Sequence, residues 1–227
     1  MPRAASQRFD ASIFPHLGLK KGCSGGILAE AGTGGKSMED SGVACAAGSL
    51  SMDGGAMHWS MVEGTPLGTL WVVAGARGVR RVIFGEDAAS EWAALQAAHP
   101  ELIRWDEGLA AQAIAQILEY LRGKRKTFTV PLDPEGTAFQ QAVWRETLRI
   151  PYGQTISYAE LARRIGRPGA TRAVGQALGA NPLPILIPCH RVVASDGSLG
   201  GYTGGLSLKR WLLLLEGSAG ALPAQKR

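Results

Sequence analysis

The chain of 227 residues has few cysteines and no long apolar run, and both absences exclude classes of protein. Three cysteines are an odd number and do not make a disulfide framework, which favours a reducing compartment: the cytoplasm, or the nucleus in a eukaryote. No run of about 18 apolar residues is present, so the sequence predicts no transmembrane helix. The first 20 residues lack the apolar core of a signal peptide, so secretion is not expected.

Tryptophan and tyrosine are missing from the start of the chain: all six Trp and all four Tyr lie after position 58. Residues 1–57 are rich in Gly, Ser and Ala and show no sustained hydrophobic period, so they predict a flexible extension. Residues 31–37 look like a phosphate-binding loop, but Glu30 stands where that loop needs its first glycine. Cys23 and Cys45 have no second cysteine or paired histidines at ligand spacing, so no metal site is predicted.

Surplus positive charge is absent from the first 133 residues. Residues 1–57 have a net charge of zero, residues 58–133 of −1 and residues 134–227 of +6. A local basic excess is typical of a polyanionic partner such as nucleic acid. The last segment therefore holds the candidate binding surface.

Residues 58–133 have an α/β pattern without a catalytic constellation, which predicts a structural domain. Two β-rich runs, 69–74 and 79–84, are joined through Gly75 and Gly78 and predict a hairpin. Apolar residues at helical spacing predict an amphipathic helix over 109–121. The other predicted elements of this segment are a helix over 87–98 and short strands over 102–105 and 127–130.

Beyond residue 133 the pattern changes to short helices. Phe139, Ala142, Val143 and Ile150 share one helix face, and the helix is expected to stop at Pro151. Ser157-x-x-Glu160 predicts a capping box that opens a second helix, with Leu161, Ala162 and Ile165 buried. A Gly/Pro turn at 166–169 and a third helix over about 170–180 complete a helix-turn-helix pattern.

The helix over 170–180 is unusual for a protein that reads DNA sequence. Recognition helices project long polar side chains onto base edges, but this one offers Arg172 and Gln176 among small residues. The pattern favours sequence-independent contact, with Arg172 as the side chain long enough to enter the base stack. An ordinary helical hairpin packed on the core is the alternative, and the pattern alone does not separate the two.

A candidate reactive thiol lies in Pro188-Cys189-His190-Arg191, after the apolar run 185–187, which predicts a buried strand. The thiolate is the nucleophilic form of cysteine, and a neighbouring imidazole and cation are the groups that can activate it. Adjacent side chains on an extended segment point apart, so His190 is expected to reach Cys189 through a bridging water. A buried structural cysteine is the alternative.

Short segments from about residue 135 to 217 carry a family resemblance. They are Ile150-Pro151-Tyr152-Gly153, Ser157-Tyr158, Arg172-Ala173-Val174-Gly175, Asn181-Pro182, Ile187-Pro188-Cys189-His190-Arg191-Val192, Gly200-Gly201-Tyr202-x-Gly204-Gly205, Lys209 and Glu216-Gly217. With these segments the chain closely resembles the O6-alkylguanine-DNA alkyltransferases, the methylated-DNA–protein-cysteine methyltransferases. Residues 58–133 resemble the less distinctive N-terminal domain of that family.

The resemblance implies an α/β (α+β) fold in which an RNase H-like N-terminal domain precedes a C-terminal winged helix-turn-helix domain. The expected division is an extension at 1–57, an α/β domain at 58–133, the DNA-binding and active-site domain at 134–220 and a tail at 221–227. The implied activity is irreversible transfer of an alkyl group from O6 of guanine in DNA, and from O4 of thymine, to the protein's own cysteine. A thioether is chemically inert, so each chain is expected to react once.

The resemblance also implies a role for each matched residue. Cys189 would accept the alkyl group, His190 and Glu216 would keep it as thiolate through a water, and Tyr158 would protonate the leaving guanine. Double-stranded DNA is the expected partner of a monomer, with no membrane, cofactor or metal. The DNA-contacting residues would be Arg172, Gln176, Asn181 and Arg167, with Arg172 filling the place of the extruded base and Asn181 tying the recognition helix to the active-site strand. The base pocket would be lined by Tyr202, Thr203 and Val192, and family members often carry serine where Thr203 stands.

Two other functions fit parts of the pattern. A non-catalytic protein that binds alkylated DNA, or a regulator, would use the same helix-turn-helix but would not need the Cys-His-Glu set. A thiol hydrolase with a Cys189, His190 and Glu216 triad would turn over repeatedly, and it leaves the helix-turn-helix unexplained. Incubation with labelled methylated DNA separates both from a single-use acceptor, because only the acceptor keeps the methyl group.

Overall fold

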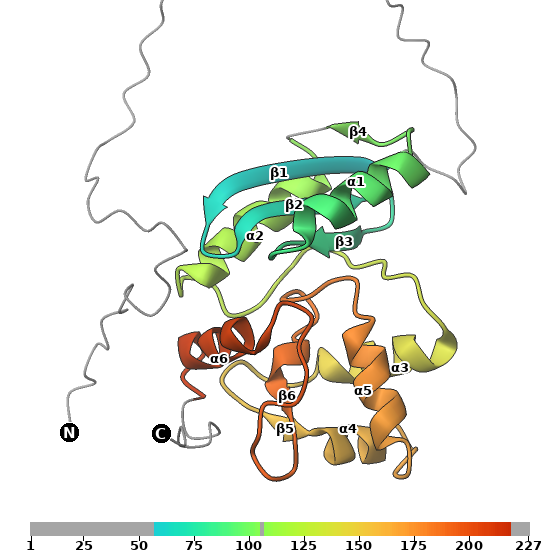
Figure 1. The fold of residues 1–227 in the computed structure, drawn as a ribbon, viewed down its shortest axis with the longest axis vertical. Coiled ribbons are helices and arrows are strands. Elements are labelled where there is room, and N and C mark those ends of the chain that lie inside the picture. Colours follow the sequence, from blue (N-terminus) through green and yellow to red (C-terminus); the bar gives the residue numbers. More distant parts are fainter. Residues whose placement is uncertain (1–56, 105–106, 219–227) are drawn as a thin grey trace, which may run out of the picture. The chain divides into compact units, whose positions relative to one another are not determined.

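The computed structural model describes residues 57–104 and 107–218. The expected extension (apart from residue 57) and the expected tail beyond residue 220 lie outside the described residues, so the division of the chain proposed from the sequence remains a prediction there. Residues 57–133 build a sheet with two helices, and residues 134–218 build a mainly helical part (Figure 1).

The first part contains one sheet of four strands in the order β3-β2-β1-β4. Strands β1 (His58–Thr65), β2 (Gly68–Ala74) and β3 (Val79–Ile83) pair antiparallel, and the short β4 (Ile103–Arg104) lies parallel to β1. The predicted hairpin between β2 and β3 is confirmed, and Gly75 N–H donates to Gly78 O across its turn at 3.0 Å. Strand β1 adds to the predicted elements.

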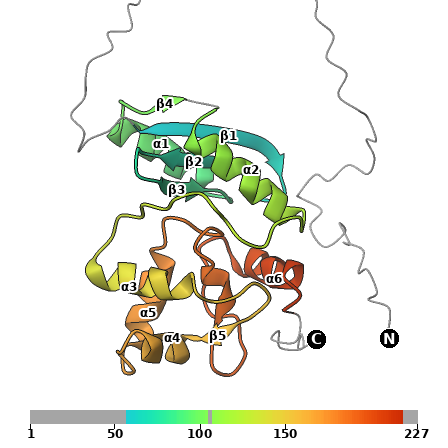
Figure 2. The same cartoon turned by 180° about the vertical axis from the view of Figure 1, so that it is seen from behind.

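The two helices of this part, α1 (Ala88–Ala98) and α2 (Leu109–Leu121), lie on opposite faces of the sheet (Figures 1 and 2). Both confirm the helices expected from the sequence. On α1, Trp92 is buried and its ring lies against Trp59 of β1 and Trp71 of β2. Helix α2 buries a face that includes Ile117 and Tyr120, both fully inaccessible to solvent.

The strand predicted over 127–130 is wrong. Residues 127–130 form no ladder, and the backbone N–H of Thr129 donates instead to the side chain of Gln116 on α2 at 2.8 Å. Gln116 Nε2 in turn donates to Thr129 Oγ1 at 2.8 Å. The side-chain amide of Gln116 thus makes the hydrogen bonds that a partner strand would have made. An isolated β-bridge to the sheet forms two residues later, between Val79 and Leu132.

The second part contains the predicted helix-turn-helix, α4 (Tyr158–Arg164) and α5 (Thr171–Gly179), packed on α3 (Ala138–Thr147). The turn between α4 and α5 includes Gly166 at φ +70°, a conformation that glycine adopts without a Cβ penalty. Trp144 of α3 is buried and its indole N–H donates to Ala177 O on α5 at 2.8 Å. That bond joins the packing helix to the second helix of the motif.

Helix α3 is shorter than predicted, because it ends at Thr147 and Ile150 lies beyond it. The residue before a proline is disfavoured in the α region, and Ile150 precedes Pro151. The carbonyl of Ile150 accepts a hydrogen bond from Arg191 Nη1 at 2.6 Å, which joins the segment after α3 to the Cys189 turn. Ile150 is nevertheless buried, as its apolar spacing indicated.

The cap at the start of α4 is half of the predicted box. Ser157 Oγ accepts from the Glu160 backbone N–H at 3.1 Å, but the Glu160 carboxylate pairs with Arg163 and Arg164 instead of returning to the cap. Leu161 and Ala162 are buried as expected, whereas Ile165 is only half-buried. Helix α4 therefore starts at the predicted residue with a single side-chain cap.

The buried strand predicted over 185–187 is also wrong, although its burial is correct. Ile185 has φ +73°, which a β-branched residue rarely adopts and which interrupts an extended run. The segment turns, with Ile187 N–H donating to Leu183 O at 2.8 Å. Residues Cys189–Arg191 then form a 3-10 turn, followed by β6 (Val192–Val193), which pairs in parallel with β5 (Ile156–Ser157). Helix α6 (Leu206–Leu215) closes the described part.

Candidate functional site

The candidate site is a cavity of about 530 Å³ between the helix-turn-helix and the segment around Cys189. The pairing of β5 with β6 brings it about, since β5 leads directly into Tyr158 of α4 and β6 follows directly after Cys189–Arg191. The lining residues come from α4, α5, the Cys189 turn and the loop before α6: Tyr158, Thr171, Arg172, Gly175, Leu178, Gly179, Cys189, Gly201, Tyr202 and Thr203.

Cys189 reaches this cavity from a nearly buried position, with 6% of its surface exposed. Asn181 Nδ2 donates to its sulfur at 3.2 Å and to Ile187 O at 3.0 Å, while Asn181 Oδ1 accepts from Leu183 N–H. Asn181 lies two residues after the end of α5, so its amide connects the end of that helix to the Cys189 segment. These contacts are the geometry that the role implied by the resemblance would need, and that role stays a prediction.

The protonation states around Cys189 are set mainly by burial. Burial raises the pKa of the Cys189 thiol, against a lowering by the Asn181 hydrogen bond and the charge of Lys209. Burial also lowers the pKa of His190, although Glu216 opposes that shift. Near neutral pH the thiol therefore keeps its proton and the imidazole is uncharged. The neutral imidazole of His190 is therefore a candidate base for the proton of the Cys189 thiol.

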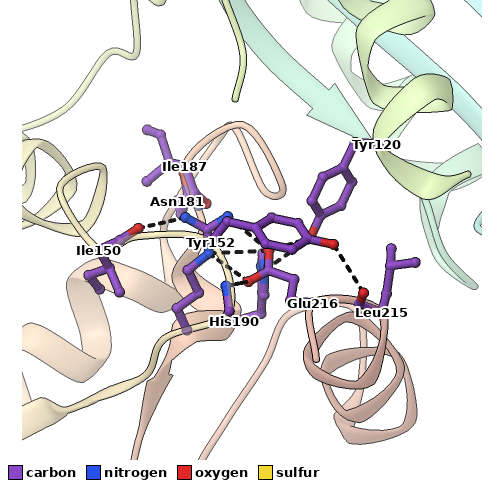
Figure 3. A network of polar contacts seen from close by, with 10 residues as sticks. Tyr120, Ile150, Tyr152, Asn181, Ile187, His190, Leu215 and Glu216 are labelled. Atoms are coloured by element: carbon purple, nitrogen blue, oxygen red, sulfur yellow. Dashed lines mark hydrogen bonds and ion pairs between the residues drawn. The ribbon is translucent and has the colours of Figure 1, made fainter. Parts of the chain in front are cut away.

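His190 lies in a buried polar network centred on the Glu216 carboxylate (Figure 3). His190 Nε2 lies 3.1 Å from Glu216 Oε1, and Arg191 donates to both carboxylate oxygens, with Nη2 at 2.8 Å from Oε1 and Nε at 2.9 Å from Oε2. The backbone N–H of Gly153 donates to Oε2 at 3.0 Å. Glu216 is thus held ionised and fixed by donors from several segments.

Tyr120, which sequence reasoning missed, joins this network from α2 of the first part. Its hydroxyl lies 2.7 Å from Glu216 Oε1 and 3.3 Å from His190 Nε2. The sequence did contain a signal, since Tyr120 falls on the apolar face of α2 three residues after Ile117, and a buried tyrosine hydroxyl needs a partner. The segment over 58–133 therefore contributes to the candidate site as well as to structure.

Lys209 is a second residue to which sequence reasoning gave no role. It is fully buried, and its ammonium group donates to Val192 O at 2.6 Å, Leu199 O at 2.5 Å and Gly201 O at 3.2 Å. Burial lowers its pKa to about 8, against the effect of Cys189. Three carbonyls occupy its three donors, so Lys209 holds the loop that forms one wall of the cavity.

Tyr158, in the first turn of α4, lines the same cavity as Cys189. Burial and then the Cys189 charge raise the pKa of Tyr158, so the phenol keeps its proton at neutral pH and can donate it. Its hydroxyl donates to Gly201 O at 3.4 Å. A Cβ at Gly200 would lie 2.8 Å from the Tyr158 hydroxyl, and Gly200 also has φ +64°, so this position requires glycine on both counts.

The structure does not bring all predicted site residues to the cavity. Tyr202, Thr203 and Arg172 line it, whereas Val192 is buried and contributes its carbonyl to Lys209. Gln176 is exposed on α5, and Arg167 is exposed in the turn before α5. Both lie on the exposed surface of the helix-turn-helix, outside the cavity.

Two general features of residues 57–104 and 107–218 bear on other functions. Within these residues, no helix is long and apolar enough to cross a membrane. In the same ranges, no three His, Cys, Asp or Glu side chains gather in a group that could hold a metal ion.

Glu216 makes the fold acid-sensitive in a predictable direction. Burial alone would raise its pKa, but hydrogen bonds from His190 and Arg191 lower it to about 2. Because the pKa of Glu216 is lower in the folded chain than the ordinary value of 4.5, its ionised carboxylate stabilises the fold at pH values above 4.5. This contribution, on the order of 3 kcal/mol, is lost as the pH falls from 4.5 to 2. We expect Glu216→Gln to lower the free energy of unfolding by a similar amount at pH 7 and by much less at pH 3, measured by urea denaturation. A gap that stays constant between these pH values would contradict this assignment.

Comparison with known proteins places both parts of the chain in one family. The sequence model described as "6-O-methylguanine DNA methyltransferase, ribonuclease-like domain" matches residues 57–134, and "6-O-methylguanine DNA methyltransferase, DNA binding domain" matches residues 138–218. These matches confirm the fold class predicted from the sequence.

Individual relatives agree. The inducible methylated-DNA–protein-cysteine methyltransferase of Bacillus subtilis is 51% identical over 126 residues, which cover 56% of this chain and 70% of the relative. The methylated-DNA–protein-cysteine methyltransferase of Methanosarcina acetivorans is 39% identical over 71% of this chain and 99% of its own. The crystal structure of Mycobacterium tuberculosis OGT in complex with DNA is 39% identical, with a TM-score of 0.61 over 74% of this chain and 96% of that one.

Proposed function

Because the chain belongs to the 6-O-methylguanine DNA methyltransferase family, whose members are methylated-DNA–protein-cysteine methyltransferases that repair DNA, we propose that Cys189 accepts the alkyl group and does so once. The observation that carries the proposal is the position of Cys189 in a cavity that also contains Tyr158 and Arg172. A nucleophile, a proton donor and a cation share one site beside the helix-turn-helix. The substrate is O6-alkylguanine in DNA, with O4-alkylthymine as a second substrate.

The reaction starts with the removal of a proton from Cys189. The S–H bond breaks, and the proton passes through a water to His190, which becomes an imidazolium next to the ionised Glu216. The thiolate attacks the alkyl carbon, a C–S bond forms and the C–O6 bond breaks. Tyr158 gives its proton to the departing guanine and regains one afterwards, so the thiol proton is transferred overall to the base.

The thiolate can reach the alkyl carbon only if the base leaves the duplex. A cavity of about 530 Å³ at the helix-turn-helix supports extrusion of the base into it. Arg172 lines this cavity from the first turn of α5, where its side chain can enter the space that the base vacates. Extrusion costs a few kcal/mol, and a cation that fills the gap offsets part of that cost.

Binding to DNA is expected to be independent of sequence and made by a monomer. The exposed long polar side chains of α5 are Arg172 and Gln176, too few to read a base sequence. Arginines of the helix-turn-helix, including Arg167, supply phosphate contacts, which position a protein without reading bases. The affinity should therefore fall as salt rises and should change little with duplex sequence.

Mass spectrometry of the full-length protein tests the proposal directly. After mixing with a duplex that contains O6-methylguanine, we expect a gain of one methyl group, located on the peptide that contains Cys189. An unmodified duplex is the control and should leave the mass unchanged. A methyl group on another residue, or free methanol with unmodified protein, would overturn Cys189 as the acceptor, and the second result would favour a thiol hydrolase.

A further inference from the structure

We propose that Tyr120 is a positioning residue of this reaction: its hydroxyl fixes His190 as the Nε2–H tautomer, which leaves Nδ1 free to accept the thiol proton. The inference rests on the proposed function in taking Cys189 as the reacting group. It assigns a role in the chemistry to α2, which lies outside the helix-turn-helix part of the chain.

Three polar atoms form a closed triangle in the buried network (Figure 3). Tyr120 Oη lies 2.7 Å from Glu216 Oε1, Tyr120 Oη lies 3.3 Å from His190 Nε2, and His190 Nε2 lies 3.1 Å from Glu216 Oε1. The side chains of His190 and Glu216 and the whole of Tyr120 are inaccessible to solvent. The protons at these three atoms must therefore be distributed among the three side chains themselves.

The distribution follows from which groups can donate. Glu216 is ionised, because its pKa is about 2, and a carboxylate only accepts hydrogen bonds. The shortest contact, from Tyr120 Oη to Oε1, thus uses the single tyrosine proton. Toward Nε2, the tyrosine oxygen and Glu216 Oε1 can then act only as acceptors. An Nε2 atom without a hydrogen would therefore lie next to two acceptors with no donor between them. Nε2 must carry the hydrogen, and it is shared between Glu216 and Tyr120.

The consequence appears at the other ring nitrogen. A neutral imidazole with its proton on Nε2 has a lone pair on Nδ1. Among the described residues, His190 Nδ1 is buried and has no hydrogen-bond partner from the protein. Nδ1 is therefore the atom to which the thiol proton goes, and the resulting imidazolium is stabilised by Glu216 and by the lone pair of Tyr120 Oη.

The chain offers a matched control in Tyr152. Its hydroxyl donates to the backbone carbonyl of Leu215 at 3.0 Å, and its ring meets the Tyr120 ring edge-on with centroids 6.1 Å apart. Tyr152→Phe thus removes the same hydroxyl from the same neighbourhood without removing a hydrogen bond to Glu216 or His190. A difference between the two variants reports the contact with the carboxylate and imidazole.

The experiment follows alkylation of Cys189 by iodoacetamide between pH 6 and 10, with the Cys189 peptide quantified by mass spectrometry. We expect Tyr120→Phe to react about tenfold more slowly than the wild type at pH 7 and to approach the wild-type rate at pH 10, where hydroxide ionises the thiol without His190. Tyr152→Phe should follow the wild-type profile. Reaction with free O6-benzylguanine at pH 7 should fall by the same factor in Tyr120→Phe alone.

Two results would overturn the proposal. One is a Tyr120→Phe profile that coincides with the wild type, and the other is a drop by one constant factor at every pH, which indicates a structural role. The nitrogen chemical shifts of His190 give a second test. Protonated Nε2 in the wild type together with a shift toward protonated Nδ1 in Tyr120→Phe supports the proposal, and protonated Nδ1 in the wild type, or the same shifts in both proteins, overturns it. Neither measurement uses methylated DNA, so a failure of Cys189 to accept a methyl group from DNA would be recognised separately.

Discussion

Cys189→Ser should bind DNA as the wild type does and should transfer no methyl group. A serine hydroxyl is a far weaker nucleophile than a thiolate, and its higher pKa places ionisation beyond the reach of a neutral imidazole. The side chain is almost isosteric and remains within reach of the Asn181 amide, so the cavity keeps its shape. Transfer of labelled methyl groups to protein, measured beside a DNA-binding titration, separates loss of chemistry from loss of binding.

Substitution of the other cysteines provides the control for this result. Cys23→Ser and Cys45→Ser should keep full transfer, because the proposal assigns the chemistry to Cys189 alone. In the wild type, excess methylated duplex should stop reacting at one methyl group per chain, because a thioether is stable. Repeated turnover, or residual transfer by Cys189→Ser, would contradict the single-use mechanism and favour the thiol hydrolase.

The second large effect is expected for Arg172→Ala, and it should depend on the substrate. Repair of a methylated duplex should slow by about 100-fold, since the variant must extrude the base without a side chain to fill the gap, at a cost of a few kcal/mol. Reaction with free O6-benzylguanine, which needs no extrusion, should stay within about twofold of the wild type. Single-turnover rates at saturating substrate give both numbers.

Arg167→Ala is the comparison for Arg172→Ala, because Arg167 is exposed in the turn before α5 and does not line the cavity. Because Arg167→Ala removes a phosphate contact, this variant should bind DNA more weakly, and its affinity should depend on salt by about one ion less. Its reaction rate at saturating DNA should be unchanged. Equal losses of Arg172→Ala on duplex and on free base would mean that Arg172 supports the active site and does not act in extrusion.

Local patterns in the sequence determined a large part of this fold. The hairpin of β2 and β3 and the helices α1, α2, α4 and α5 agree with their predictions to within a few residues. Each depends on side-chain periodicity and turn residues within one short segment, so neighbours along the chain contain the information. The cysteine at 189 and its neighbours were identified in the same way, and the family resemblance followed from short contiguous segments.

Two of the errors in the prediction are strands that form no strand in the structure. Polar and apolar side chains alternate over residues 127–130 as in a strand. The Gln116 side chain, however, accepts the hydrogen bond from the Thr129 backbone N–H that a neighbouring strand would have accepted. Residues 185–187 have the apolar character of a strand, yet Ile185 adopts φ +73° and the segment turns. Strand formation requires a second segment at the right place, and one segment's composition does not specify it.

The candidate site shows the same division. The sequence predicted roles for Cys189 and His190, and the family resemblance implied one for Glu216. The tertiary structure decided how His190 and Glu216 are connected. Tyr120 lies 96 residues from Glu216 along the chain, and its role is visible only where α2 meets the buried carboxylate. A buried ionised group must satisfy its hydrogen bonds from whatever elements surround it, and folding, not local sequence, decides which elements those are.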